Sequence, residues 1–260
     1  MRILAHRGSP GPTSVENTVP AVLGCLSAGA DGVEVDLRLS ADGVFVVCHD
    51  PDLRRLTGSA LPVASTPWDV LHAAADARAV PLARLEWMLA ALAGRPVVIE
   101  VKAPPPGPGA IRRTAEAVVE RLTVLRAAGL ALDVTVSSFA PPVVAAVRGI
   151  APTSLGIRTA QLGRPTVRAD AVLRQALAAG HDEIHPHVAA LLAEPGCVAA
   201  AHRCGVGVVP WTVNRSRAVR RLAGLGVDAL ITDVPAKALA VSMTVSSRER
   251  DTPATTPRAS

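Results

Sequence analysis

The sequence predicts an α/β fold, a (β/α)8 TIM barrel in which eight parallel strands alternate with helices. Its length of 260 residues is close to the roughly 250 residues of a typical barrel of this kind. Short apolar runs rich in β-branched residues recur eight times along the chain. Ala/Leu-rich segments with helical spacing separate most of these runs, which indicates parallel strands joined by crossover helices. We therefore expect residues 1–243 to form one barrel domain.

The individual strands and helices follow from these runs in chain order. The expected strands are Ile3–Ala5, Val33–Leu37, Val97–Val101, Val134–Ser137, Leu155–Ile157, Glu183–His185, Val206–Pro210 and Ala229–Ile231. The clearest helical patterns between them are Val19–Ala28, Leu85–Leu92, Ala110–Ala127 and Arg215–Leu225. The polar, Pro-bearing segment 244–260 shows no periodicity, so we expect a disordered tail there.

A ninth apolar run, Val44–Cys48, does not fit a count of eight strands. Asp42-Gly43 precedes it, and Asp-Gly is a strong signal for a two-residue hairpin turn. Because so short a connection cannot make a parallel crossover, we expect an extra strand that runs antiparallel to the second one. The predicted register pairs Asp36 with His49. The Pro-containing region 51–96 that follows should form a small excursion above the barrel.

Composition narrows the class of partner. The chain is 49% hydrophobic and 19% charged, as expected for a globular protein. Its net charge of +5 comes from scattered arginines without neighbouring aromatics, which argues against a nucleic-acid surface and suits a small anionic substrate. No apolar run approaches the ~20 residues that span a bilayer. The four cysteines lack C-x-x-C spacing and no secretory signal is visible, so we expect reduced thiols and a cytoplasmic location.

Three carboxylates are the first sign of chemistry. Alternation along Gly32–Leu39 places Glu34 and Asp36 on the face that points into the barrel. Two carboxylates there repel each other and lose hydration, so a cation must lie between them. Glu100 adds a third, near the carboxyl end of another strand, where barrel enzymes hold their active residues. Hard oxygen ligands of this kind favour Mg²⁺ or Ca²⁺.

Two simpler interpretations of the carboxylates stay open. Glu34 could be an exposed end residue while Asp36 pairs with a nearby arginine such as Arg38. Glu100 could pair with Lys102, although residues two apart on one strand are poorly placed for a close pair. The second interpretation also leaves the carboxylates of the other strand unexplained.

Cationic and imidazole side chains are expected at the same end of the barrel. His6 and Arg7 close the first apolar run, His49 closes the hairpin run, and Lys102 follows Glu100. A divalent cation with Arg7 and Lys102 would form a clamp suited to a phosphate diester. Two histidines could then serve as general base and general acid. Their order in the chain does not say which is which.

The ordered set of motifs closely resembles the glycerophosphodiester phosphodiesterase family. The resemblance covers residues 2 to 240 and is carried by HRG at His6–Gly8, ENT at Glu16–Thr18, E-x-D at Glu34 and Asp36, HD at His49-Asp50, E-x-K at Glu100 and Lys102, SSF at Ser137–Phe139, PWTVN at Pro210–Asn214 and GVDALITDVP at Gly226–Pro235. It implies a barrel enzyme that cleaves glycerophosphodiesters to glycerol 3-phosphate and an alcohol, within lipid and glycerol metabolism. The partner is then a small molecule rather than a nucleic acid or a membrane interior.

The resemblance also implies roles for single residues. His6 and His49 would be the acid/base pair, and Glu34, Asp36 and Glu100 would hold Mg²⁺ or Ca²⁺. Arg7 and Lys102 would contact the phosphate, and Trp211 would either line the glycerol side of the pocket or belong to the core. Outside this set, we expect Asn17 to cap the first helix, Glu16 to support the rim, and Asp233 to orient a residue of the site. We interpret His185–His187 as a strand end followed by a Pro turn.

Two rival functions remain. Lysophospholipase D-type hydrolysis would use the same site and would need an apolar groove beside the pocket. A non-catalytic phosphodiester-binding barrel would be expected to lack a histidine or a carboxylate, and this chain has them all.

Overall fold

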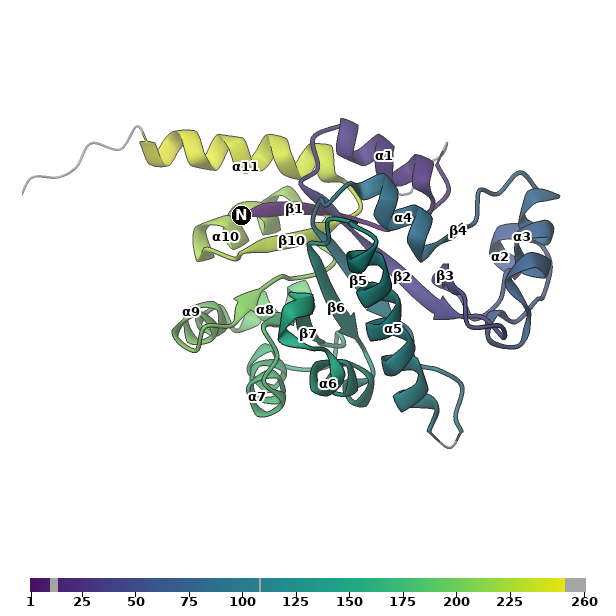
Figure 1. Ribbon diagram of the computed structural model, residues 1–260. Coiled ribbons are helices and arrows are strands. Elements are labelled where there is room, and N and C mark those ends of the chain that lie inside the picture. The colour runs from purple at the N-terminus through teal and green to yellow at the C-terminus, as the bar shows by residue number, and fades with distance from the viewer. Residues whose placement is uncertain (10–13, 108, 251–260) are drawn as a thin grey trace, which may run out of the picture.

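Eight parallel strands form one continuous ladder in the computed structural model, which describes residues 1–9, 14–107 and 109–250. Figure 1 shows these strands in the interior with helices around them. The order along the ladder is β10-β1-β2-β5-β6-β7-β8-β9. The strands are β1 (Arg2–His6), β2 (Gly32–Leu39), β5 (Val97–Val101), β6 (Val134–Ser138), β7 (Arg158–Leu162), β8 (Glu183–His185), β9 (Gly207–Val208) and β10 (Ala229–Thr232).

Backbone hydrogen bonds link the two ends of this ladder. The Asp228 amide donates to the Val208 carbonyl, and the Ile231 amide donates to the carbonyl of Pro210, just beyond β9. The Val213 amide then donates back to the carbonyl of Ile231. The ends of the sheet therefore meet, and the predicted TIM-barrel architecture is confirmed.

Helices cover the outer face of the sheet. Outward-facing strand residues such as Val35, Ile99 and Ile184 are completely buried against them. Thr18 caps the start of α1, since its hydroxyl accepts the Ala21 amide, and Pro20 lies in the first turn. The helices are α1 (Val19–Ser27), α4 (Leu85–Leu92), α5 (Ala110–Ala127), α6 (Pro141–Ile150), α7 (Ala169–Ala179), α8 (Val188–Ala193), α9 (Gly196–Arg203), α10 (Ser216–Leu225) and α11 (Pro235–Arg250), with the 3-10 helix η2 at Thr153–Leu155. No helix in the described ranges combines the length and apolar character needed to cross a bilayer.

The fifth barrel strand lies later in the chain than predicted. Leu155–Ile157 was the expected strand, but η2 occupies its start and β7 begins at Arg158. The sequence of β7 is RTAQL, which has no run of apolar residues. Its first residue, Arg158, belongs to an ionic cluster with Glu183 inside the barrel. Arg158 Nε donates to Glu183 Oε1 at 2.8 Å, and His185 Nε2 lies 2.9 Å from Glu183 Oε2. This strand could not be recognised from apolar residues because some of its positions carry polar side chains that pair inside the barrel.

The antiparallel extra strand is present as β3 (Phe45–Val47), but its predicted register is wrong by one residue. Leu37 pairs with Val47, which puts Asp36 level with Cys48 rather than His49. The turn has three residues instead of two, because the Ser40 amide donates to the Val44 carbonyl and the Ser40 hydroxyl accepts the Val44 amide. Three-residue hairpin loops of this kind end in a left-handed residue, here Gly43 with φ +81°.

The region after β3 forms a small layer with its own apolar core. Its elements are α2 (Arg54–Thr57), η1 (Val63–Ser65), α3 (Trp68–Asp76) and β4 (Ala83–Arg84), and β4 pairs antiparallel with β3. Figure 1 shows α2 and α3 beside β3, away from α6–α10. Leu53, Leu71 and Trp68 are buried in this layer together with Val46. The predicted excursion exists, although the last part of 51–96 is α4, an ordinary barrel helix.

The end of the domain also departs from expectation. α11 continues to Arg250, so it reaches into the segment 244–260 for which no regular structure was expected. The remainder of that segment, 251–260, lies outside the described residues.

Candidate active site

The register of three neighbouring strands brings the carboxylates together. His6 on β1 pairs with Glu34 on β2, and two residues further along β2 Asp36 pairs with Glu100 on β5. All three carboxylates are buried, and one oxygen of each lies within 4.8 Å of the others. Alternation of side chains and parallel register are therefore sufficient to place them on one face at the carboxyl end of the sheet.

Two cations balance part of this negative charge. Lys102 Nζ lies 2.6 Å from Asp36 Oδ1 and 2.5 Å from Glu100 Oε1. Arg7 Nε lies 3.1 Å from Asp36 Oδ2. The expectation that Glu100 and Lys102 are badly placed for a close pair is wrong, because Lys102 lies just beyond β5 and its long side chain folds back. Arg38 does not pair with Asp36; its guanidinium donates to the His49 carbonyl.

Glu34 is paired more weakly than the other two carboxyl groups. Its nearest cationic partner among the described residues is the His6 ring, with Nε2 3.8 Å from Glu34 Oε2. Burial and the neighbouring Asp36 carboxylate raise the pKa of Glu34 to about 8. Among the described residues, none donates a hydrogen bond of good geometry to Asp36 Oδ1, although Lys102 lies near it. Three converging carboxylates with acceptor capacity to spare fit a hard divalent cation such as Mg²⁺ or Ca²⁺.

The loop after β1 adopts an unusual backbone conformation. Arg7 and Asn17 have φ values of +53° and +59°, a region that L-residues rarely occupy. Gly8 is also left-handed, and a Cβ there would lie 3.0 Å from the Val22 amide nitrogen. The expected helix cap at Asn17 is wrong: Thr18 caps α1, and Asn17 Nδ2 donates to Asp36 Oδ2 at 2.8 Å. Strain at a site of this kind persists because the surrounding contacts hold it.

His6 is held by a carboxylate from the last strand. Its Nδ1 lies 2.6 Å from Asp233 Oδ1, directly after β10, and Asn214 Nδ2 donates to Asp233 Oδ2. Burial lowers the pKa of His6, but the Asp233 hydrogen bond and the Glu34 charge outweigh it and leave that pKa raised. The free Nε2 therefore points toward the carboxylate cluster with a fixed ring orientation.

His49 is held by a second and separate carboxylate. Its Nδ1 lies 2.8 Å from Asp50 Oδ1, and Arg55 Nε donates to Asp50 Oδ2 at 2.6 Å. Arg55 also binds Glu16, which in turn accepts a bond from Arg7 at 3.2 Å. Burial lowers the pKa of His49, and the Asp50 bond only partly offsets that effect. Arg55 thus connects the excursion to Asp50 and Glu16 at the edge of the site. No pattern in the sequence predicts this contact.

One cavity of about 230 Å³ joins these groups. His6, Arg7, Glu34, His49, Glu100, Lys102 and Trp211 all line it. Asp36 lies behind them, completely buried and in ion pairs with Arg7 and Lys102. Trp211 forms one wall and meets Phe139 edge to face, with ring centroids 5.2 Å apart. Its Nε1 donates to the carbonyls of Gly163 and His185, which fixes the indole.

Comparisons with known proteins agree with this geometry. The model of the Glycerophosphoryl diester phosphodiesterase family matches residues 6–237. The chain belongs to that family. It is 30% identical over 254 residues to YqiK of Bacillus subtilis, covering 92% of this chain and 98% of that protein. It is 28% identical over 251 residues to a glycerophosphodiester phosphodiesterase of Bacillus altitudinis, covering 92% and 97%.

A solved structure shares the fold of this family member. The phosphodiesterase of Oleispira antarctica, determined with the product sn-glycerol-3-phosphate, superposes with a TM-score of 0.76 at 22% identity. The alignment covers 93% of this chain and 96% of that one. Family membership makes the enzyme class that of phosphoric diester hydrolases.

Some residues of this family member's cavity were not singled out by sequence reasoning. Phe139, Leu162 and His185 also line it. His185 was interpreted as a plain strand end, yet it is completely buried at the cavity. The only available signal was that it lies on an inward-facing position of β8, two residues after Glu183. His187 instead caps α8 by accepting the Ala189 amide.

Proposed function

We propose that this protein hydrolyses glycerophosphodiesters to glycerol 3-phosphate and an alcohol. One observation carries the proposal: two buried carboxylates with a third directly behind them, two cations and two separately anchored histidines meet at a single cavity. A phosphate diester is the anion that such a cluster suits best, since positive groups can lie against its non-bridging oxygens while the histidines transfer protons.

Each group has a place in the reaction. Glu34, Asp36 and Glu100 would hold a divalent cation, which when bound supplies Lewis-acid stabilisation of the phosphate charge. Arg7 and Lys102 lie beside these carboxylates and would contact the phosphate oxygens. One histidine accepts a proton from water as its oxygen attacks phosphorus, and the other protonates the departing alkoxide as the phosphorus–oxygen bond breaks. Trp211 and Phe139 supply the apolar wall against which the glycerol carbons pack.

The proposal agrees with the size of the cavity and with the relatives. A volume of about 230 Å³ suits a small glycerol phosphate unit with little room for more. The Oleispira antarctica phosphodiesterase holds sn-glycerol-3-phosphate as its product. A small metabolite with this chemistry also agrees with the expected role in lipid and glycerol metabolism.

The direct test is turnover of glycerophosphocholine in the presence of Mg²⁺ or Ca²⁺, with glycerol 3-phosphate detected by a coupled assay. We expect activity in the parent protein and its loss in His6→Ala and in His49→Ala, with circular dichroism and melting temperature little changed. Full activity in either variant would contradict the assigned roles. No turnover of any glycerophosphodiester, with binding retained, would favour the non-catalytic barrel.

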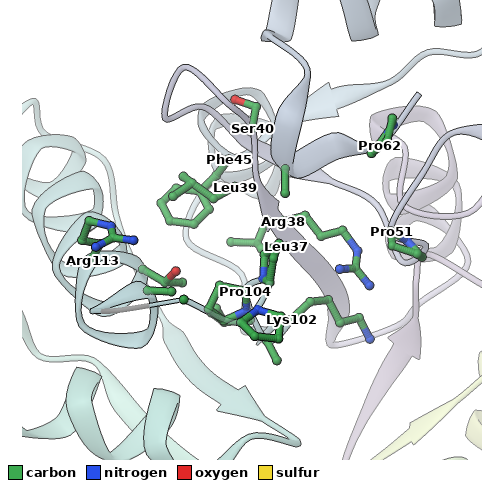
Figure 2. A pocket seen from close by; sticks show the side chains of 18 residues that line it. Leu37, Arg38, Leu39, Ser40, Phe45, Pro51, Pro62, Lys102, Pro104 and Arg113 are labelled. Atoms are coloured by element: carbon green, nitrogen blue, oxygen red, sulfur yellow. The ribbon is translucent and has the colours of Figure 1, made fainter. Parts of the chain in front are cut away.

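An apolar groove makes lysophospholipase D-type hydrolysis a second candidate. The groove has a volume of about 550 Å³ and lies between the excursion and the loop after β5. Figure 2 shows Phe45, Leu39 and Pro104 along it, with Pro62 on the excursion side. It meets the rim at Lys102 rather than at Trp211. Because the acyl chain of a lysophospholipid is attached to its glycerol, a chain in this groove requires the glycerol to lie near Lys102 rather than against Trp211.

Lysophosphatidylcholine tests this second candidate. Ala64 is exposed on η1 and lines the groove, so Ala64→Glu adds a charge there without disturbing the core. If the groove holds an acyl chain, this variant should lose more activity on lysophosphatidylcholine than on glycerophosphocholine. An equal effect on both substrates, or no lipid turnover in the parent protein, would eliminate the second candidate.

A further inference from the structure

A second cavity adjoins the active site on the His49 side. Its volume is about 380 Å³, and it shares His49, Glu100, Lys102 and Phe139 with the cavity described above. His6 and Trp211 do not line it. If the glycerol packs against Trp211, the alcohol on the other side of the phosphate extends into this cavity. We refer to it as the side cavity.

The lining of the side cavity carries an excess of positive charge. Lys102 is matched by Asp36 and Glu100, but Arg38 and Arg164 also line the cavity. Within the described part of the chain, neither arginine forms an ion pair with a carboxylate: Arg38 binds a carbonyl and Arg164 lies over a ring. In Figure 2 the side chains of Arg38 and Lys102 extend in the same direction, with their charged ends away from Phe45.

Arg164 occupies a position that its neighbours define. Its guanidinium carbon lies 5.2 Å from the centre of the Phe139 ring, within the range of a cation–π contact. Gly163 before it is buried, and a Cβ there would lie only 2.5 Å from a methyl group of Val172. The Gly163 carbonyl accepts the Trp211 indole N–H at 3.2 Å, and the Arg164 carbonyl accepts the Val167 amide. The same aromatic pair therefore connects the glycerol wall to the exposed guanidinium of Arg164.

We propose that the side cavity binds the alcohol part of the substrate and selects alcohols that carry an anionic group, with Arg164 as the specificity-determining residue. This inference rests on the proposed function. A guanidinium pairs with a carboxylate through charge-assisted hydrogen bonds. Arg164 lies over Phe139 and forms no ion pair among the described residues, so its N–H groups are available for such a partner. A cationic headgroup such as choline meets Arg38 and Arg164 as like charges.

Two substrates that differ by one carboxylate test the inference. Glycerophosphoserine equals glycerophosphoethanolamine plus a carboxylate, so the ratio of their kcat/KM values reports on recognition of that group. We expect the parent protein to favour glycerophosphoserine by about tenfold, the size of one modest charge-assisted hydrogen bond. In Arg164→Gln the ratio should fall to about one, and Arg164→Lys should retain part of it.

A matched variant separates this effect from net charge. Arg220 is exposed on α10 and lines none of the cavities described above, so Arg220→Gln removes the same charge and should leave the ratio unchanged. Equal kcat/KM for both substrates in the parent protein, or a ratio that Arg164→Gln does not alter, would overturn the inference while the proposed function stands. Absence of turnover with both substrates would overturn the proposed function, and the inference with it.

Discussion

His6 Nδ1 and Asp233 Oδ1 lie 2.6 Å apart, although the two residues are at opposite ends of the barrel sequence. The contact exists because β1 and β10 are neighbours in the sheet, with Ala5 level with Thr232. Asn214 binds the second oxygen of Asp233, and its own Oδ1 accepts the Asp233 amide. A histidine of the candidate active site is thus oriented by the segments that complete the barrel.

This contact predicts that Asp233 positions His6. Asp233→Asn keeps the size of the side chain but removes its charge and one of its two acceptor oxygens. Because Asn214 Nδ2 donates to the other oxygen, the new amide would turn an NH2 donor toward His6 Nδ1 in place of the acceptor that fixes the imidazole tautomer. We expect kcat for glycerophosphocholine to fall roughly 10–100-fold, the usual effect of losing such a supporting partner, with KM changed little. The pH profile should also move, because Asp233 helps to hold the pKa of His6 up.

The control for Asp233 is an aspartate without a role in the site. Asp69 is exposed in the first turn of α3, so Asp69→Asn should leave kcat and the pH profile unaltered. If Asp233→Asn behaved in the same way, the orienting role would be wrong.

The weakly paired, buried carboxyl of Glu34 predicts how the protein responds to metal. We expect EDTA to abolish turnover, and added Mg²⁺ or Ca²⁺ to restore it and to raise the melting temperature by binding the folded state. In Glu34→Gln the metal-induced rise in melting temperature should largely disappear. Activity that survives exhaustive metal removal would contradict the three-carboxylate site.

The same residue predicts a pH effect on the metal-free protein. The pKa of Glu34 is about 8 when folded against an ordinary value of 4.5. An acid whose pKa is raised by folding destabilises the fold as it ionises, so stability should fall as pH rises from about 4.5 to 8. Metal-free Glu34→Gln should therefore melt above the parent protein at pH 8 and near it at pH 4.5. A lower melting temperature of the variant at pH 8 would contradict the assigned cause.

The parts of the fold that follow from local patterns could be predicted from the sequence. Alternation along β2 was sufficient to place Glu34 and Asp36 on one face, and Asp42-Gly43 was sufficient to predict the antiparallel strand. The register was missed because the Ser40 side chain, rather than the Asp-Gly pair alone, shapes the turn. His49 still reaches the site, because Arg38 binds its carbonyl beyond the end of β3.

What could not be predicted depends on contacts between distant segments. β7 was misplaced because its polar Arg158 pairs with Glu183 from the next strand. The short Lys102–Glu100 contact depends on a lysine that bends back from beyond the strand end. Asn17 was assigned to a helix cap, the commonest use of asparagine before a helix, whereas its left-handed backbone directs it to Asp36.

The backbone at Gly8, in the loop after β1, predicts that this position tolerates no side chain. Its φ of +76° disfavours any L-residue, and a Cβ would lie about 3.0–3.1 Å from the backbone of α1. Gly8→Ala should therefore shift Arg7 away from the carboxylates. We expect it to lower kcat/KM for glycerophosphocholine by more than Gly43→Ala does, while both variants lower the melting temperature by a similar amount. Gly43→Ala is the matched control: its φ of +81° is also positive, but no atom of the residues that the structure describes lies within 4 Å of the added Cβ. Equal loss of activity in both variants would attribute the effect to backbone strain alone.

Glu183 predicts the acid sensitivity of the fold. Burial raises its pKa, but the bonds from His185 and Arg158 outweigh this and lower it to about 2, against an ordinary 4.5. A depressed pKa contributes stability that is complete above pH 4.5 and is lost as pH falls toward 2. The shift corresponds to roughly 3 kcal/mol at neutral pH. Glu183→Gln should therefore lower the melting temperature at pH 7 and flatten its decline between pH 4.5 and pH 2.

A surface glutamate provides the comparison for Glu183. Glu116 pairs with Arg112 along the exposed side of α5, where solvent screens the interaction, so Glu116→Gln should follow the parent protein at every pH. Melting curves of the three proteins from pH 7 to pH 2 give the answer. An unchanged slope in Glu183→Gln would mean that acid unfolding begins elsewhere. A flattened slope in Glu116→Gln would mean that surface pairs, rather than the ion cluster in the barrel, determine it.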